Sequence, residues 1–413
     1  MYGGKGMTFL QAKQKLEQWN QMHLLQFYDE LAEDEKISLL KQIEDIDFSV
    51  IKGDEESLMV HKRGEITPLE AMQMNDIKER ETYFFEIGKN ALIDGKVAAV
   101  LLAGGMGTRL GSEDPKGMYN IGITRDVFIF QRLVENLLDV VRKVGCMIPL
   151  YIMTSDKNHQ VTVDFFEKKN YFGYDRSFVR FFKQEMAAAT DRTGKVLLEQ
   201  KHIISTSPNG NGGFFKSMAK EGILDEIAGK VEWLNVFSVD NVLQRICDPC
   251  FVGAVIDAKV SVGSKVVKKT CKEERVGVMC LEDGKPSIVE YYELTQNMLD
   301  EINDKGELAY NYGVTLNYLF SVDKLKSIYQ NSLEHHVVKK KVNYIDSMGE
   351  MVYPEDENAY KYEQLVLDMI YQLDSCLAYE VERTYEFAPI KNKDGVDSVD
   401  TARELLIQNG YSL

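Results

Sequence analysis

The sequence lacks any apolar run that approaches the roughly 20 residues of a membrane-spanning helix. Its first residues, MYGGKGMTFLQAKQ, also lack the apolar centre of a signal peptide. We therefore expect a cytoplasmic protein without a membrane partner. Residues 1–6 are either native or a remnant in front of a natural start at Met7, and the sequence leaves both interpretations open.

Positive charge is also scarce. The 413 residues include 49 Lys and Arg against 65 Asp and Glu, which gives a formal net charge of −16. Because nucleic acids and anionic membranes require a basic face, we expect neither as a partner. A small anionic substrate needs only a local basic patch. The chain is longer than one hydrophobic core usually supports, so we expect one large domain with smaller appendages. A monomer is the expectation for the oligomeric state, although nothing in the sequence indicates it.

The pattern of a zinc or redox site is missing as well. Of six cysteines, only Cys247 and Cys250 lie close together, and neither a second CxxC nor a suitably spaced histidine accompanies them. A structural role is therefore favoured over zinc or redox chemistry. His335 and His336 are adjacent, so on a strand they point to opposite sides, which favours structural roles for both.

Two kinds of pattern divide the chain. Residues 8–93 are expected to be helical, with a helix-start signal at Thr67-Pro68. From Lys96 onward strand-like and helix-like stretches alternate, which indicates an α/β sheet. The expected strands are 97–103, 150–154, 179–182 and 233–239, and the expected helices are 127–143, 160–169, 215–228 and a later one near 362–373. Extended segments after residue 258, with a hairpin turn at Asp283-Gly284, indicate a β insertion.

The stretch 98–122, AAVLLAGGMGTRLGSEDPKGMYNIG, has the composition of a phosphate site. An apolar run typical of a buried strand is followed by four glycines, at 104, 105, 107 and 111, and by the cations Arg109 and Lys116. Glycines let backbone N–H groups approach a ligand, and N–H groups and cations both favour an anion at the carboxyl end of a strand. The sequence therefore predicts that this loop binds phosphate.

Two common phosphate loops are excluded by their residues. A dinucleotide fingerprint that starts at Gly105 would need a third glycine where Leu110 stands. A P-loop needs Gly-Lys followed by Ser or Thr, whereas Lys116 is followed by Gly117. The other expected strands also end in polar residues, at Ser155-Asp156, Gln184 and Asp240-Asn241, where open α/β sheets bind ligands.

The loop resembles a known signature. LAGGMGTRLGSEDPKGMYNIG is similar to L-x-G-G-x-G-T-R-L-G-x-x-x-P-K-G of the eukaryotic-type UDP-sugar pyrophosphorylases. Further motifs of that family follow in the family's order, over about residues 90–403. They are YIMTS, FFKQEM, SPNGNGG, VDN, VEYYEL, EHHVVKKKVNY and FAPIKN.

The resemblance implies a fold. We expect an α/β protein with a central mixed, mostly parallel, Rossmann-like nucleotidyltransferase sheet flanked by helices, of the GT-A-like type. The expected regions are a helical N-terminal part at 1–95, a catalytic domain at 96–335 with a β insertion at about 258–320, and a short C-terminal part at 336–413.

The resemblance also implies a reaction. Members closest to this sequence convert UTP and N-acetylglucosamine 1-phosphate into UDP-N-acetylglucosamine and pyrophosphate. The alternatives are glucose 1-phosphate or another sugar 1-phosphate, or a non-catalytic protein that binds nucleotide sugars. In this reaction a phosphate oxygen attacks the α-phosphorus of UTP, so no side-chain nucleophile is needed. The protein has to hold two polyanions together and neutralise charge.

Residues that match the family's motifs receive roles by resemblance. The uridine is expected at Leu102, Ala103, Gly104, Gly105, Gln184 and Gly210, and the phosphates at Arg109, Lys116, Lys361 and Lys391, of which Arg109, Lys116 and Lys391 are the catalytic candidates. The sugar or its phosphate is expected at Asn211, Glu290, Tyr291 and Asn311.

Asp240 is the expected metal ligand. A carboxylate beside a triphosphate repels it unless a cation lies between, which favours Mg²⁺, with Mn²⁺ as an alternative ion. A helix N-cap is the competing interpretation of Asp240.

One position departs from the family's pattern. The family's Asn-Ala-Gly-Asn stretch, whose second asparagine helps to hold an acetamido sugar, reads Asn311-Tyr312-Gly313-Val314 here. Val314 has no side-chain hydrogen-bonding group, so N-acetylglucosamine, glucose and galactosamine derivatives all stay open as the sugar.

Overall fold

The computed structural model describes residues 6–51, 63–329, 331, 333 and 335–413. Their contacts divide the chain into two compact units, each described here by itself. Unit 1 comprises Met1–Lys62, Glu185–Gly213 and Leu333–Leu365, and unit 2 comprises Arg63–Gln184, Phe214–Ser332 and Val366–Leu413. This division differs from the consecutive regions 1–95, 96–335 and 336–413 because each unit collects segments that are distant in the sequence.

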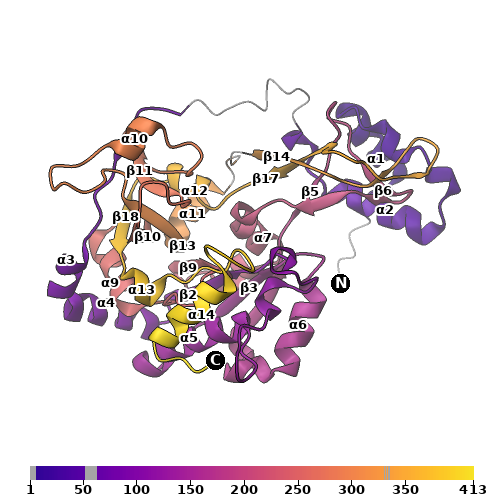
Figure 1. Cartoon of the computed structure of the whole chain (residues 1–413). Helices are drawn as coiled ribbons and strands as arrows, with labels where there is room; N and C mark the ends of the chain where they lie inside the picture. The colour runs from indigo at the N-terminus through magenta and orange to yellow at the C-terminus, as the bar shows by residue number, and fades with distance from the viewer. Residues whose placement is uncertain (1–5, 52–62, 330, 332, 334) are drawn as a thin grey trace. The chain divides into compact units, whose positions relative to one another are not determined.

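Unit 2 is built on a ten-stranded mixed sheet whose main path is β1-β11-β13-β9-β2-β3-β4 (Figure 1). Four neighbouring strands are parallel, namely β9 (Trp233–Ser238), β2 (Val97–Leu102), β3 (Leu150–Thr154) and β4 (Val179–Lys183). All residues of β2 and β3 are buried, which explains their continuous apolar sequence. The expected α/β class and these four strands are confirmed.

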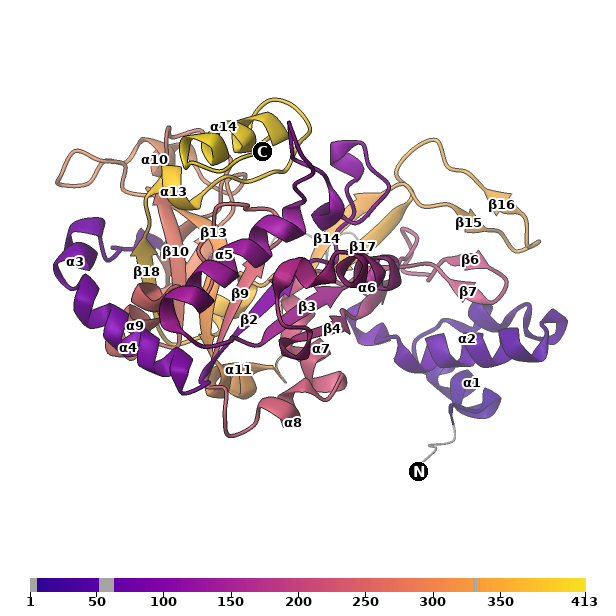
Figure 2. The ribbon, with the colours of Figure 1, turned by 90° about the horizontal axis from the view of Figure 1, so that it is seen from below.

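Helices cover the parallel strands. Figure 2 shows α5 (Ile129–Val144) and α6 (His159–Lys168) in front of β2 and β3. The single helix expected at 215–228 is wrong, because the chain forms α7 (Phe214–Lys220) and α8 (Ile223–Ile227) instead. Gly222 between them has a φ of +73°, a left-handed conformation that ends a helix.

Two further helices pack at very short range. A Cβ placed on Gly88 of α4 (Glu81–Ile93) would lie 1.9 Å from the carbonyl oxygen of Pro249 in α9 (Pro249–Ala258). A Cβ on Gly253 of α9 would lie 1.8 Å from the carbonyl oxygen of Phe84. The two glycines therefore allow the helix backbones to touch.

The remaining strands of the sheet form the expected β insertion and its borders. β11 (Val278–Glu282) and β12 (Lys285–Val289) make a hairpin whose turn residues, Asp283 and Gly284, both have positive φ, as a two-residue turn of this kind requires. The hairpin prediction is confirmed. Three further strands complete this part of the sheet, and the short helix α10 follows the hairpin in the chain. They are β10 (Val262–Lys268), β13 (Tyr312–Ser321) and β18 (Cys376–Glu380), with α10 at Gln296–Asp300.

The helix start predicted at Thr67-Pro68 is wrong. Residues Ile66–Pro68 form strand β1, which pairs antiparallel with Glu282–Cys280 of β11. The next helix, α3 (Met74–Glu79), begins only at Met74. Pairing with β11 at the edge of the sheet thus determines the conformation of this segment, although its local residues favour a helix cap. Pro68 is tolerated there because an edge strand does not need every backbone N–H.

Unit 1 combines helices with short strand pairs. Its helices α1 (Phe9–Gln18) and α2 (Glu33–Asp45) confirm part of the helical N-terminal region, and they bury apolar residues against strand residues such as Leu198 and Ile204. The longest pair, β14 (His336–Lys340) with β17 (Ala359–Glu363), runs side by side in Figure 1. The shorter strands are β5 (Met186–Ala188), β6 (Leu198–Gln200), β7 (Ile203–Ile204), β8 (Thr206–Pro208), β15 (Tyr344–Ile345) and β16 (Met351–Val352).

The chain after β13 adds short helices. They are α11 (Val322–Ile328), α12 (Asp368–Tyr371), α13 (Arg383–Glu386) and α14 (Val399–Gln408). Only residues 368–371 of the helix expected near 362–373 are helical, because its first residues pair in β17. Among the described residues, no helix has both the length and the apolar character needed to cross a membrane.

Candidate active site

The glycine loop leaves the carboxyl end of β2 and folds back on itself. The Gly107 N–H donates to the Asp114 carbonyl at 2.8 Å, and the Lys116 N–H donates to the Gly105 carbonyl at 3.2 Å. Gly111, with a φ of +75°, adopts a left-handed conformation that most side chains avoid. These hydrogen bonds close the loop and place Lys116 next to Gly105, close to the end of β2.

Gly104 and Gln184 lie against each other at this edge of the sheet. A Cβ on Gly104 would lie 2.4 Å from Nε2 of Gln184, so the glycine is needed for the contact. Gln184 directly follows β4, and its N–H donates to the Thr154 carbonyl at 2.8 Å. The Gln184 residue is only 6% exposed, yet its side-chain amide has no hydrogen bond within the described part of the chain. Its donor and acceptor are therefore available to the edge of a ligand.

Lys116 meets Asp240, the residue expected to bind metal. Nζ of Lys116 lies 2.6 Å from Oδ1 of Asp240, and the two side chains are 12% and 35% exposed. Asp240 lies two residues beyond the carboxyl end of β9, and its N–H donates to Oγ of Ser238. Two residues that were separately expected near the phosphates, the loop cation and the strand-end carboxylate, therefore form an ion pair. No helix begins at Asp240, so the N-cap interpretation is wrong, and α9 starts later, at Pro249.

The donor set at Asp240 constrains how a metal could bind. Across the residues that the structure describes, no group of three or more His, Cys, Asp and Glu side chains could hold an ion. Asp240 thus offers a single protein carboxylate. Mg²⁺ is commonly held by one or two carboxylates together with substrate phosphates and water, so this carboxylate fits an ion that binds along with a phosphate ligand.

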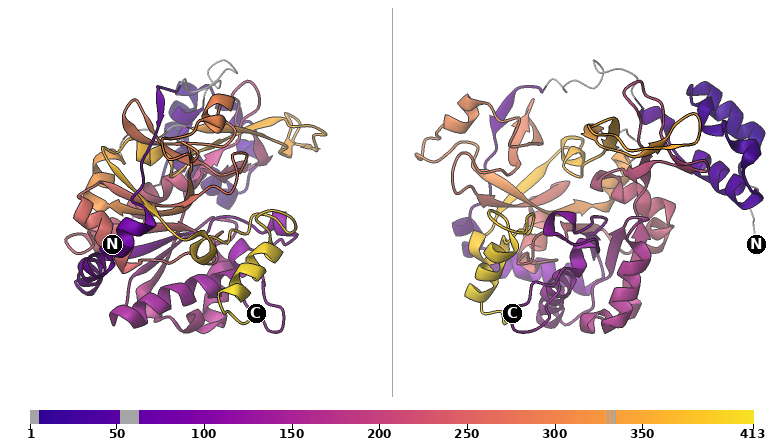
Figure 3. Two further views of the ribbon diagram at one scale, coloured as in Figure 1. Left: turned by 60° about the vertical axis from the view of Figure 1, so that its left-hand side comes forward. Right: turned by 45° about the vertical axis from the view of Figure 1, so that its right-hand side comes forward.

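Lys391 comes to the same edge from the C-terminal segment. The N–H of Ile390 donates to the Asp240 carbonyl at 2.9 Å, which places Lys391 directly beyond that contact. Nζ of Lys391 pairs with Oδ2 of Asp397 at 3.0 Å. In the left view of Figure 3 this yellow segment passes beside the purple loop that follows β2. Arg109 is exposed and has no side-chain partner among the described residues.

Glu290 and Val314, which are far apart in the sequence, lie next to the same glycine. A Cβ on Gly277 would lie 3.4 Å from Oε2 of Glu290 and 3.5 Å from Cγ2 of Val314. The backbone fixes this arrangement, because the Val314 N–H donates to the Gly277 carbonyl at 2.9 Å. A carboxylate and an apolar side chain are thus presented together.

Arg63, which the sequence analysis missed, supports the segment that carries Glu290. Its guanidinium pairs with Glu282 at 2.9 Å and with Glu293 at 2.8 Å. Oε2 of Glu293 in turn accepts a hydrogen bond from the Glu290 N–H at 2.9 Å. No motif marks Arg63, because its partners lie more than 200 residues away in the sequence.

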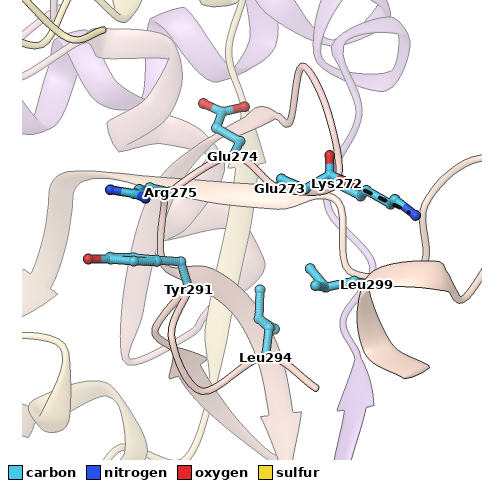
Figure 4. A pocket seen from close by; sticks show the side chains of 7 residues that line it. All are labelled: Lys272, Glu273, Glu274, Arg275, Tyr291, Leu294 and Leu299. Atoms are coloured by element: carbon cyan, nitrogen blue, oxygen red, sulfur yellow. Dashed lines mark ion pairs between the residues drawn. The ribbon is translucent and has the colours of Figure 1, made fainter. Parts of the chain in front are cut away.

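Tyr291 lines a cavity of about 450 Å³. Figure 4 shows its ring and the Arg275 side chain extending in the same direction, and the other lining residues are Lys272, Glu273, Glu274, Leu294 and Leu299. Asn311 is instead used inside the fold, since its Oδ1 accepts from the Lys269 N–H at 3.1 Å and the residue is 8% exposed.

Three expected ligand residues belong to unit 1. Gly210 has a φ of +88°, and a Cβ there would lie 2.2 Å from the carbonyl oxygen of Gln364, so this position requires glycine. Asn211 opens the 3-10 turn that follows it, and Lys361 lies on β17 opposite Val338 of β14.

Comparison with known proteins identifies the family. The family described as UTP–glucose-1-phosphate uridylyltransferase matches residues 49–407. The chain belongs to this family. It is therefore a nucleotidyltransferase.

Members of this family with similar sequences and structures carry informative names. UDP-N-acetylglucosamine pyrophosphorylase of Saccharomyces cerevisiae is 35% identical over 367 residues, which are 84% of this chain and 76% of that protein. UDP-N-acetylhexosamine pyrophosphorylase-like protein 1 of Homo sapiens is 34% identical over 425 residues, 96% of this chain and 83% of that protein. The structure of uridine diphosphate N-acetylglucosamine pyrophosphorylase from Trypanosoma brucei, bound to an inhibitor, superposes with a TM-score of 0.78 at 26% identity and covers 96% of this chain and 83% of that one.

The cysteine pair of this uridylyltransferase-family chain belongs to the hydrophobic core and not to the candidate site. Cys247 and Cys250 are free and buried among apolar side chains. Burial raises the pKa of the Cys250 thiol to about 12, so it stays protonated at neutral pH.

The Arg63 cluster predicts a pH-dependent stability. Burial by itself would raise the pKa of Glu282, but hydrogen bonds from the Gly64 N–H, Arg63 and Ser287 outweigh it and lower the pKa below 4.5. A lowered pKa in the folded state stabilises the protein above the unfolded-state pKa, and this stabilisation is lost as the pH falls through the folded-state value. We expect Glu282→Gln to reduce the free energy of unfolding by about 1–3 kcal/mol at neutral pH, and by less at about pH 3.

Urea unfolding at the two pH values measures this difference. The exposed Glu65, replaced in Glu65→Gln, is the matched control and should leave the free energy of unfolding nearly unchanged at both. A loss in Glu282→Gln that is the same at both pH values would contradict the role given to the charge.

Proposed function

We propose that this chain transfers the uridylyl group of UTP to N-acetylglucosamine 1-phosphate, forming UDP-N-acetylglucosamine and pyrophosphate. The observation that carries the proposal is the meeting of Gln184, the glycine loop, Lys116 and Asp240 at one edge of the parallel strands. The names of the yeast and trypanosomal relatives support the choice of the sugar.

The uracil end of the site is assigned to Gln184 and the start of the loop. The free side-chain amide of Gln184 can pair with the donor and acceptor edge of uracil, and Gly104 lies against it. Leu102, Ala103 and Gly105 flank that glycine in the chain and are assigned to the uridine by the family resemblance. The family resemblance also assigns Gly210, in unit 1, to the uridine. Its glycine-only backbone is compatible with close approach of a ligand.

The phosphate end is assigned to the cations. Lys116 and Arg109 come from the loop, and Lys391 and Lys361 come from later segments. The nucleophile is a phosphate oxygen of the sugar phosphate, which is already an anion, so the protein's task is to align it with the α-phosphorus and to neutralise charge as pyrophosphate leaves. We propose that Asp240 holds Mg²⁺, with Mn²⁺ as an alternative, and that the ion supplies further charge neutralisation at the phosphates.

The sugar end is assigned to Glu290 and Tyr291 of unit 2, and the family resemblance adds Asn211 of unit 1. The Asn311 side chain already bonds to the Lys269 N–H and is not assigned to the sugar. The Glu290 carboxylate can accept hydrogen bonds from sugar hydroxyls, and Tyr291 borders the adjoining cavity. Glucose 1-phosphate is the second candidate. The side chains of Val314 and Glu290 both lie next to Gly277, and the apolar Val314 cannot form a hydrogen bond with an acetamido group.

Turnover with two sugar phosphates tests the proposed reaction. We expect pyrophosphate release from UTP to be at least about tenfold more efficient, in kcat/KM, with N-acetylglucosamine 1-phosphate than with glucose 1-phosphate. Val314→Asn should raise kcat/KM for the acetamido sugar while the KM for UTP stays the same. Equal turnover of both sugars would overturn the choice of sugar. No turnover with any sugar 1-phosphate would favour the non-catalytic binder.

Removing the Lys116 charge tests the phosphate end. Lys116→Ala should lower kcat at least about a hundredfold, which is the effect of losing a positioned charge stabiliser. Lys96, a half-buried lysine paired with Glu232, is the matched control, and Lys96→Ala should keep the wild-type rate. Steady-state kinetics of the two purified variants make the comparison. If kcat of Lys116→Ala stays within twofold of wild type, Lys116 has no part in catalysis.

Filling the space at Gly104 tests the uracil end. The methyl group of Gly104→Ala would displace the Gln184 amide, so the KM for UTP should rise about tenfold while the KM for the sugar phosphate is kept. Gln184→Ala should have the same effect, and the double variant should be no worse than either single one. Additive losses in the double variant would show that Gly104 acts independently of Gln184.

A further inference from the structure

Asn241, the residue after Asp240, is buried and connects two parts of the proposed site. It is 2% exposed, and its side chain is hydrogen-bonded at both ends of the amide. Nδ2 donates to the Glu386 carbonyl at 2.7 Å, and Oδ1 accepts from the Ala388 N–H at 2.9 Å. One side chain therefore holds two backbone groups of the segment that leads to Lys391.

Backbone contacts on either side of Asn241 continue this attachment. The Ile390 N–H donates to the Asp240 carbonyl at 2.9 Å, and the Val242 N–H donates to the Ala388 carbonyl at 3.3 Å. Pro389, which lies opposite Asn241 in a strand-like bridge, has no N–H to donate. Because Pro389 cannot donate, the backbone pairing here is incomplete, and the Asn241 side chain adds hydrogen bonds to the Glu386 carbonyl and from the Ala388 N–H.

The segment is also fixed at its two ends. The buried Glu386 carboxylate accepts from Nζ of Lys265 at 2.5 Å, and Lys265 is itself only 1% exposed. Beyond the attachment, the Lys391 N–H donates to the Asp397 carbonyl at 2.6 Å. Between these two points, hydrogen bonds of Asp240, Asn241 and Val242 attach the segment to the chain that follows β9.

We propose that Asn241 is a positioning residue that holds Lys391 in register with Asp240 for the phosphate chemistry. The inference rests on the proposed function for the roles of Lys391 and Asp240, but the attachment itself does not. Charge stabilisation depends on groups that are in place before the reaction, because a cation that must first be ordered contributes less to the transition state. Asn241 touches no substrate in this mechanism and acts through the segment at 386–391.

Hydrogen exchange tests the attachment without any assay of activity. In Asn241→Ala, the amides of Ala388 and Ile390 should exchange at least about tenfold faster than in the wild type. Asn235 is the matched control. It is a fully buried asparagine of β9 whose Nδ2 donates to Asn317 Oδ1 and the Tyr318 carbonyl and whose Oδ1 accepts from the Cys247 N–H. None of these partners belongs to the segment 386–391. Asn235→Ala should leave the exchange of the two amides unchanged. Unchanged exchange in Asn241→Ala would overturn the proposal.

A double-mutant cycle tests the connection with Lys391. Asn241→Ala should lower kcat at least about tenfold in the wild-type background and by less than twofold when Lys391 is already alanine. Asn235→Ala, if it lowers kcat at all, should do so equally in both backgrounds. Asn241→Asp, which keeps the acceptor for the Ala388 N–H, should retain more activity than Asn241→Ala.

The outcomes separate the inference from the proposed function. An equal loss from Asn241→Ala in both Lys391 backgrounds would overturn the positioning role even if the wild-type enzyme turns over its substrates. If the wild type itself shows no turnover, the proposed function fails, while the hydrogen-exchange result still decides whether Asn241 holds the segment.

Discussion

The ion pair between Lys116 and Asp240 is the interaction on which the arrangement of the candidate site depends. It joins the end of the glycine loop to the end of β9, two segments separated by more than 120 residues. The Lys116 side chain is 12% exposed and the Asp240 side chain is 35% exposed, so both charges have lost much of their contact with water. The ion pair compensates each charge for this loss. In the proposed reaction the phosphates bind next to this pair, which then sets the local charge of the proposed phosphate end.

The acidic composition of the chain fits this design. With a net charge of −16, the protein as a whole repels polyanions, so the few cations of the site have to act locally. Lys116 and Lys391 are each held by a carboxylate, from Asp240 and Asp397, and these contacts fix the lysines before any ligand arrives. The same principle applies at the sugar end, where Arg63 holds Glu293 and Glu293 holds the backbone of Glu290.

The fold was predictable from the sequence where local pattern and burial agree. The four parallel strands and the Asp283-Gly284 hairpin were predictable because buried parallel strands are continuous apolar runs and a two-residue turn needs residues that tolerate positive φ. Prediction failed where a distant segment decides the local structure. Thr67-Pro68 carries a helix-start signal but pairs with β11. The helix expected at 215–228 failed for a local reason, because Gly222 adopts a positive φ between α7 and α8.

The family and the α/β class were predictable from motifs that are contiguous in the chain, and the same motifs supplied the candidate residues of the proposed phosphate loop. Which of these residues meet depends on the tertiary structure. Gly104 against Gln184, Glu290 and Val314 around Gly277, and Asn241 against the segment before Lys391 are contacts across tens to hundreds of residues. Their distances follow from strand order and from the packing of loops at one sheet edge, and neither is encoded in any local pattern.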